Sequence, residues 1–211
     1  MKKYILLLLI IFCIYQPKNT RASLEAHKVV SNLEDENITL YAKKIDGLYQ
    51  DFKIDFKGTI YTEPFWMSVA DNPTYAPKIH YEDINKDKKE ELIVILTKGY
   101  GTGVLMEEVH VYDRRNDYLH ELFVDEPLAI IYKNVKTKLT KKKAEISLNG
   151  DKYKVDLKSH PKELYEEVSF GGIKDFEIKD QQLIVKVSVH VSPTQSVGNV
   201  VIVYEYRDNM Y

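Results

Sequence analysis

Apolar and polar residues alternate along much of the chain after residue 36. Phe52, Ile54 and Phe56 are separated by charged residues, and similar runs occur over Ile146–Leu157 and Leu183–Tyr206. A period of two is typical of strands with one buried face, and helical periodicity is scarce. The pattern predicts a mainly β (β-rich α+β) fold, a single antiparallel β domain with one or two short helices.

Turn residues divide these runs. Asn149-Gly150 lies between two alternating segments, and this residue pair favours a two-residue β-hairpin because both positions tolerate positive φ. The runs on either side of Ser192–Gly198 predict a second hairpin with a longer loop. The best helix candidate is "PKELYEEV" from Pro161, with proline and glutamate in the first turn.

The expected domain organisation is simple. No repeat of 20 to 50 residues and no Pro/Gly/Ser-rich linker is visible. Residues 1–22 are expected to be a signal peptide and residues 23–36 a polar N-terminal arm, mobile or briefly helical. Residues 37–211 are expected to form one β-rich domain.

The first 22 residues have the layout of a secretory signal. Lys2 and Lys3 precede an apolar run that ends at Tyr15, followed by small residues near Ala22. The run of about 12 residues is too short to cross a bilayer, which needs about 20. Cleavage after Ala22 is favoured over cleavage after Ala26, so we expect a secreted or cell-surface protein.

Lipidation at Cys13 is an alternative to cleavage after Ala22. It follows Ile10, Ile11 and Phe12, which resembles a bacterial lipobox, although Phe12 stands where a small residue is expected. Lipidation of Cys13 would give a membrane-bound lipoprotein. Cleavage after Ala22 would instead leave a mature chain without cysteine, so that no disulfide stabilises it.

The charge of the chain narrows the range of partners. The formal charge is −2, and removing residues 1–22 takes away four basic residues and no acid, which gives −6. An acidic protein is poorly suited to nucleic acid. The cluster Lys136, Lys138, Lys141, Lys142 and Lys143 is a local exception. It is interpreted as a solvated face, with contact to a polyanion as the alternative.

The segment "DINKDKKEE" concentrates oxygen-bearing side chains ahead of an apolar run. Asp83, Asn85 and Asp87 occupy positions one, three and five; Lys89 can offer its carbonyl at seven, and Glu91 stands at nine. Calcium takes six to eight oxygens from carboxylates, amides and backbone carbonyls. The spacing therefore predicts a calcium site, and a solvated charged turn is the alternative.

This segment resembles the calcium loop of the FG-GAP or VCBS-type modules of extracellular proteins. The resemblance covers Tyr81 to about Tyr112, including the following strand and "GYGTG", and it implies a calcium site in an extracellular module. Lys88 occupies position six, where this family prefers glycine. The helix-flanked EF-hand is less similar, because its twelfth position falls on Val94 rather than on glutamate.

The glycines Gly99, Gly101 and Gly103 do not have the spacing of a nucleotide-binding loop, and a strand-like pattern follows them. We interpret them as a β-connection that can offer backbone carbonyls near the ion. The segment from Tyr61 to Tyr75 holds Phe65 and Trp66. These two rings are expected to fill the core beneath a long irregular loop, and a platform for sugar or peptide is the alternative.

The sequence contains no motif of a known catalytic centre. The histidines are scattered, and neither H-E-x-x-H nor G-x-S-x-G occurs. Neighbouring acids such as Glu107 and Glu108 point to opposite faces of a strand and are expected at the surface. The leading hypothesis is a non-enzymatic calcium-binding module with an extracellular protein or polysaccharide as partner.

The alternative is a hydrolase of a cell-envelope polymer with structural calcium. A cleft that holds a carboxylate within hydrogen-bond reach of His80 or His110 would favour the hydrolase. A convex face lined by aromatic side chains would favour the binding module.

Overall fold

The computed structural model describes residues 26–116, 118–157 and 163–211. The expected signal peptide, residues 1–22 with Cys13, lies outside the described residues. Within the described ranges, no helix is both long and apolar enough to cross a membrane. Strands dominate these residues, which confirms the prediction of a mainly β protein.

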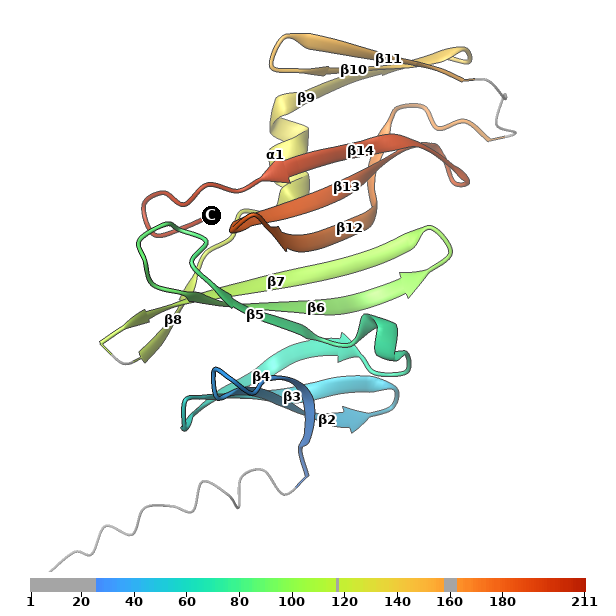
Figure 1. The fold of residues 1–211 in the computed structure, drawn as a ribbon. Coiled ribbons are helices and arrows are strands. Elements are labelled where there is room, and N and C mark those ends of the chain that lie inside the picture. Colours follow the sequence, from blue (N-terminus) through green and yellow to red (C-terminus); the bar gives the residue numbers. More distant parts are fainter. Residues whose placement is uncertain (1–25, 117, 158–162) are drawn as a thin grey trace, which may run out of the picture.

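Four antiparallel strands form the N-terminal sheet at one end of the molecule (Figure 1). They are β1 (Lys28–Leu33), β2 (Ile38–Ile45), β3 (Leu48–Phe56) and β4 (Thr59–Val69), in this order across the sheet. The expected N-terminal arm was wrong over residues 28–33, because β1 pairs with β2 from Lys28 to Leu33. The segment after Tyr61 was also expected to be irregular, yet β4 continues through Pro64 to Val69.

The central sheet has seven strands in the order β14-β13-β12-β7-β6-β5, with β8 paired to β7. Their bounds are β5 (Lys78–Glu82), β6 (Glu91–Gly101), β7 (Val104–Arg115), β8 (Tyr118–Leu122), β12 (Ser169–Lys179), β13 (Gln182–Ser192) and β14 (Gln195–Val203). A 3₁₀ turn, η2 (Pro73–Tyr75), precedes β5. The pairing of β7 with β12 is parallel, and the other strand pairs of the described residues are antiparallel, as the fold prediction expected.

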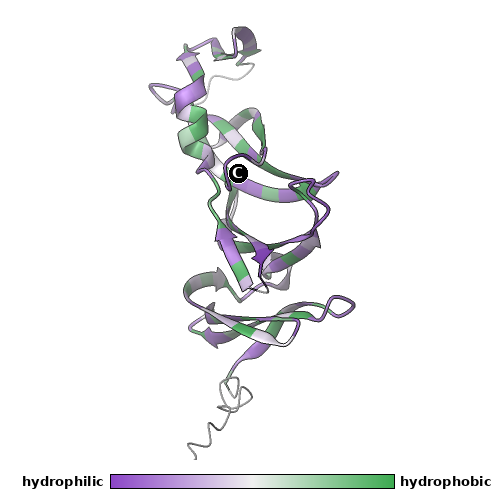
Figure 2. Cartoon of the chain, turned by 90° about the vertical axis from the view of Figure 1, so that its left-hand side faces the viewer, coloured by the Kyte–Doolittle hydropathy of each residue, from purple (hydrophilic) through white to green (hydrophobic). Residues whose placement is uncertain are grey.

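Three further strands form the distal sheet, at the opposite end from β1 (Figure 1). They are β9 (Val135–Leu139), β10 (Lys143–Leu148) and β11 (Asp151–Asp156), and β9 directly follows the helix α1 (Pro127–Asn134). Along the strands of the molecule, hydrophobic and hydrophilic residues alternate, as Figure 2 shows. This is the period-two pattern expected for strands with one buried face.

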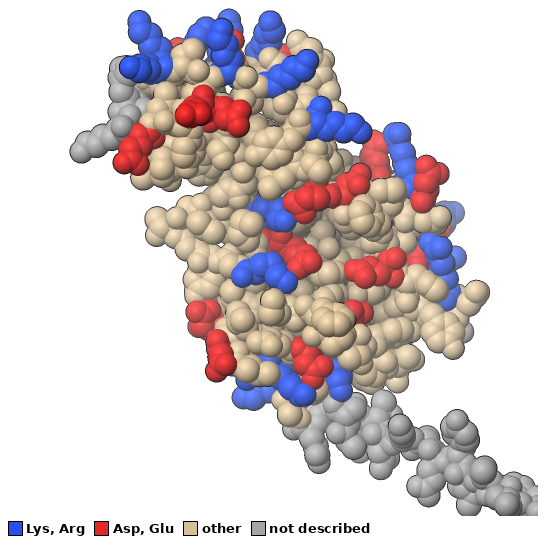
Figure 3. Space-filling view, turned by 180° about the vertical axis from the view of Figure 1, so that it is seen from behind, with Lys and Arg blue, Asp and Glu red and all other residues tan. Residues whose placement is uncertain are grey.

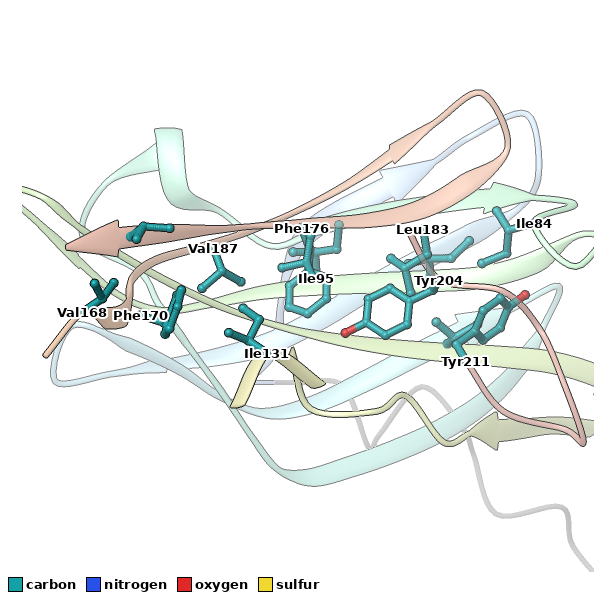
Figure 4. Close-up of a cluster of buried hydrophobic side chains, with 14 of the residues drawn as sticks. Ile84, Ile95, Ile131, Val168, Phe170, Phe176, Leu183, Val187, Tyr204 and Tyr211 are labelled. Atoms are coloured by element: carbon teal, nitrogen blue, oxygen red, sulfur yellow. The ribbon is translucent and has the colours of Figure 1, made fainter. Parts of the chain in front are cut away.

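Strand β6 is the exception to this alternation, because both of its faces are buried. Leu92, Val94 and Leu96 pack against the N-terminal sheet. Ile93 and Ile95 face the other way, into the larger core that Figure 4 shows. A strand covered on both faces needs an unbroken apolar sequence, which explains the run after the acidic loop.

The helix prediction did not hold. Residues 161 and 162 of the candidate "PKELYEEV" lie outside the described residues, and residues 163–168 are not helical. The observed helix α1 begins at Pro127, where the missing amide hydrogen of proline costs nothing, and it buries Ile131. Its eight residues are too few for a clear helical period to stand out in the sequence.

Both predicted hairpins are present. Asn149 and Gly150 have φ of 52° and 92° and join β10 to β11 as a two-residue turn. Strands β13 and β14 form the second hairpin, but Ser192 already pairs with Gln195, so its loop is shorter than predicted.

Replacing Gly150 by valine is expected to lower the free energy of unfolding by about 1–2 kcal/mol, because a β-branched residue resists the left-handed region. A β-carbon at Gly150 would meet no atom within 4 Å, so the effect isolates backbone strain from steric contact. Urea denaturation of Gly150→Val measures it, with Gly150→Asn as the control, since asparagine tolerates positive φ. Equal stability of the two variants would contradict the assignment.

Candidate functional site

The acidic segment forms the connection between β5 and β6 at one end of the central sheet. Ile84, its second residue, is 5% exposed and belongs to the larger core. Figure 4 shows Ile84 and Tyr211 at the same end of this core. One apolar side chain therefore anchors an otherwise polar loop, which limits the conformations that the loop can take.

The side chains at positions one, three and five organise the loop from inside. Asp83 accepts hydrogen bonds from the backbone N–H groups of Asp87 (3.1 Å) and Lys88 (3.0 Å). The Asn85 Oδ1 atom also accepts from the N–H of Asp87 (2.8 Å), and Asp87 accepts from the N–H of Lys89 (2.9 Å). The structure thus brings Asp83, Asn85 and Asp87 together around one turn of backbone.

The backbone of this turn is strained at two lysines. Lys86 and Lys88 have φ of 65° and 72°, the left-handed region that costs a non-glycine residue about 1–2 kcal/mol. Position six of a calcium loop requires a sharp turn, usually made by glycine. Lys88 therefore has a positive φ at this position despite having a side chain.

Glu91, at position nine, is buried at 1% exposure. Its Oε2 atom accepts the N–H groups of Ile84 (3.0 Å) and Asn85 (3.2 Å), and its Oε1 atom accepts from the Asn85 side-chain amide (2.8 Å). Burial raises the pKa of Glu91 to about 7, although these backbone hydrogen bonds oppose the rise. Glu91 therefore closes the base of the loop from the protein side.

The donor set of the loop suits a hard cation by its chemistry, since it consists of carboxylate and amide oxygens. A carboxylate oxygen that accepts one N–H keeps a second lone pair for a cation. Over the ranges that the structure describes, however, no three His, Cys, Asp or Glu side chains gather closely enough to hold a metal ion. The oxygens available to a cation are therefore those of Asp83, Asn85 and Asp87. The Glu91 carboxylate is directed toward the backbone of the loop instead.

Tyr211 is a neighbour of this loop that the sequence analysis missed. Its side chain is 5% exposed, and its hydroxyl oxygen has no hydrogen-bond partner among the described residues. Burial raises the pKa of Tyr211, and the charges of Glu91, Asp83 and Asp87 add to the rise. Since Tyr211 lies 120 residues along the chain from Glu91, no local sequence pattern links the two.

The glycine-rich segment cannot contribute to this loop. Glu91 begins β6 and Gly101 ends it, so the two lie roughly 30 Å apart along one strand. The expectation that the glycines offer carbonyls to the ion was therefore wrong.

A second candidate site lies beside β7 and β8. A cavity of about 360 Å³ is lined in part by Glu108, His110, Glu121 and Phe123. The Nδ1 atom of His110 lies 2.7 Å from the Glu121 carboxylate, and its ring stacks on Trp66 at 4.1 Å. This is the carboxylate and histidine pair named above as favouring a hydrolase. The Nε2 atom of His110, however, is buried and has no hydrogen-bond partner within the described part of the chain.

Of the two aromatic residues that were expected in the core, one is buried and the other is exposed. Trp66 is 7% exposed and packs on Phe52, whereas Phe65 is 91% exposed, so the core prediction was wrong for Phe65. The cause is that strand β4 continues through both residues. Successive side chains of a strand point to opposite faces, so only one of the two rings can enter the core.

Comparisons of the chain with models of protein families, with curated proteins and with solved structures found no match.

Proposed function

We propose that this protein is an exported binding module, secreted or held at the cell surface, in which the loop Asp83–Glu91 binds one calcium ion. The conformation of Lys88 carries the proposal. Its left-handed φ of 72° turns the backbone so that Asp83, Asn85 and Asp87 surround one turn. Position six is where a calcium loop makes its sharp turn, usually with glycine, and Lys88 supplies a positive φ there.

Two further features support a cation in this place. Asp83 and Asp87 lie close enough to bond to the same backbone segment, and a cation would relieve their mutual repulsion. The Tyr211 hydroxyl is a buried polar atom without a partner among the described residues. Burial raises its pKa, and the charges of Glu91, Asp83 and Asp87 add to the rise. Asp83, Asn85 and Asp87 would hold the ion, with the Lys89 carbonyl and Glu91 as the remaining members of the predicted set.

The bound ion would order the entry to β6. This strand is buried on both faces and belongs to both cores, so its first residue, Glu91, must be placed accurately. Calcium at the loop would neutralise the carboxylates at this position and stabilise the surfaces that β6 supports. The ion has a structural role in this proposal and takes part in no reaction.

A binding module is favoured over a polymer hydrolase because of the geometry at His110. A general base must reach the substrate with one free ring nitrogen. The Nδ1 atom of His110 is engaged by Glu121, and its Nε2 atom is shielded from solvent. The ring is held between Trp66 and the sheet as a packing element, which leaves no nitrogen for a substrate.

Calcium is expected to raise the melting temperature of the mature protein. Extracellular calcium modules bind with dissociation constants of about 10⁻⁴–10⁻³ M, so about 1 mM calcium adds roughly 0.4–1.4 kcal/mol of stability. For a chain of this size the rise is about 1–5 °C. Asp87→Ala should abolish the rise, while Asp35→Ala, which removes an exposed carboxylate elsewhere, should keep it. Magnesium should substitute poorly, because it demands a smaller octahedral shell.

Differential scanning calorimetry in calcium and in a chelator makes this measurement. A melt that is identical in both solutions would support the charged-turn alternative. An equal rise in Asp87→Ala would show that calcium binds elsewhere on the protein.

A further inference from the structure

The distal sheet presents a lysine-rich face that the sequence reveals only in part. The register places Lys136 of β9 opposite Ser147 of β10, which in turn lies opposite Lys152 of β11. In the next row on the same face, Lys138, Glu145 and Lys154 are aligned in the same way. We call this the basic face; it comprises Lys136, Lys138, Lys143, Glu145, Ser147, Lys152, Lys154 and Asp156, with Lys141 and Lys142 in the adjoining turn.

The opposite face of the distal sheet is apolar and turned inward. Val135, Leu139 and Ile146 pack against the larger core, and Ala144 is fully buried within it. Since successive residues of a strand point to opposite faces, the basic face points to solvent. Figure 3 shows Lys and Arg side chains gathered at this end of the molecule.

The charge of the basic face is opposite to that of the whole protein. Its seven lysines and two acids give a formal charge of +5, whereas the full chain carries −2. Lys143 pairs with Glu145 at 2.6 Å and holds the pKa of that carboxyl below its usual range. Across the described ranges, none of the other six lysines makes an ion pair within 4.0 Å. Within the described residues these six lysines therefore have no ion pair, although the charges of Lys138 and Lys154 also help to lower the pKa of Glu145.

The lysines are near enough to act together. Residues two apart on one strand are separated by about 7 Å, and residues two strands apart by about 10 Å. At 0.1 M salt the screening length is about 10 Å, so the potentials of neighbouring lysines add. Such an array attracts a partner that itself carries repeated negative charges.

We propose that the basic face binds a linear anionic polymer with repeating phosphate or carboxylate groups. The inference names the partner class of the binding module and to that extent rests on the proposed function. The side chains on this face are charged or hydroxylated, so the attraction is electrostatic and depends on charge density rather than on a shaped pocket. Lysine, a compact and strongly hydrated point charge, suits this mode of binding.

A polymer fits this face better than a membrane does. Peripheral membrane binding combines basic residues with apolar side chains that enter the lipid, and the basic face offers no apolar side chain. Glu145 lies between Lys138 and Lys154, so it separates the lysines of β9 from those of β11, and a flexible chain can run along either strand without crossing Glu145.

The test is binding of fluorescently labelled sodium polyphosphate and poly-glutamate to the mature protein, in a chelator and at 50 mM salt. The face variant combines Lys136→Gln, Lys138→Gln, Lys152→Gln and Lys154→Gln. The control variant makes the same change in net charge elsewhere, with Lys28→Gln, Lys57→Gln, Lys179→Gln and Lys186→Gln. Circular dichroism melts establish that both variants remain folded.

We expect the wild type to bind polyphosphate with an affinity that falls steeply with salt. The face variant should bind at least about tenfold more weakly, and the control variant should stay within about threefold of the wild type. Equal losses in both variants would show a response to net charge alone and would overturn the proposal. So would binding to vesicles with 30% phosphatidylglycerol but to neither polymer, which would indicate a membrane instead.

Calcium titration of the same variants separates this inference from the proposed function. Calcium binding without polymer binding would overturn the basic-face proposal and leave the calcium loop intact. Polymer binding that the face variant loses, in a protein without calcium binding, would overturn the calcium loop and leave the basic face.

Discussion

Replacing Glu107 by alanine is expected to lower the free energy of unfolding by about 1–3 kcal/mol, the usual cost of leaving a buried N–H group without its hydrogen-bond partner. Glu107 is 2% exposed, so the expectation that it lies at the surface was wrong. Its Oε1 atom accepts from Lys78 Nζ at 2.8 Å and its Oε2 atom from the Phe176 N–H at 2.7 Å. The backbone pairing of β7 with β12 covers two residue pairs and stops at Lys174. The Glu107 carboxylate thus links β7 to β12 by a hydrogen bond beyond the point where their backbone pairing ends.

The neighbouring glutamate supplies a matched control. Glu108 points to the other face, is about half exposed, and pairs with Lys98 at 2.8 Å. Exposed ion pairs contribute about 0–1 kcal/mol, so Glu108→Ala should cost no more than that. Urea denaturation of both variants at pH 7 compares them. If the two substitutions cost the same, Glu107 does not join β7 to β12 as described.

Glu91→Gln is expected to remove a pH dependence of stability worth about 3 kcal/mol. The pKa of Glu91 is raised from 4.5 to about 7 in the folded state, chiefly by burial. Below about pH 4.5 the carboxyl is protonated in both the folded and the unfolded state. Between about pH 4.5 and pH 7 the unfolded state has lost this proton while the folded state keeps it, so the unfolded state gains about 1.4 kcal/mol for each pH unit.

The free energy of unfolding of the wild type, minus that of Glu91→Gln, should therefore fall between pH 4.5 and pH 8. Urea denaturation at unit steps of pH measures this difference. Because both proteins contain the same other titratable groups, the effects of those groups on stability cancel in the difference. A chelator must be present, because a nearby cation would lower the pKa of Glu91. A difference that stays constant over this range would contradict the raised pKa.

The strands were predictable where alternation was strong. Phe52, Ile54 and Phe56 are all buried on one face of β3, and Asn149-Gly150 makes the predicted turn. Strand β1 was missed because it lies at the edge of its sheet and several of its residues are exposed. An edge strand gains its conformation from pairing with β2, and a polar sequence carries little sign of such pairing.

The candidate site was predictable only as far as its residues are local. Asp83, Asn85 and Asp87 meet in one loop because their spacing brings them together within five residues. Burial of Glu91, and the proximity of Tyr211, depend on contacts made by distant parts of the chain. Only part of the basic face could be predicted from the sequence, for the same reason. Lys152 and Lys154 lie beside the earlier lysines only because β10 pairs with β11.

A crystal structure of residues 23–211 grown in about 10 mM calcium would show whether the loop Asp83–Glu91 binds the ion. We expect an anomalous peak within the loop, with oxygens of Asp83, Asn85 and Asp87 at about 2.3–2.6 Å from it, the range for calcium. A well-ordered loop without such a peak, at this calcium concentration, would contradict the calcium site. The segment would then be a charged turn into a buried strand.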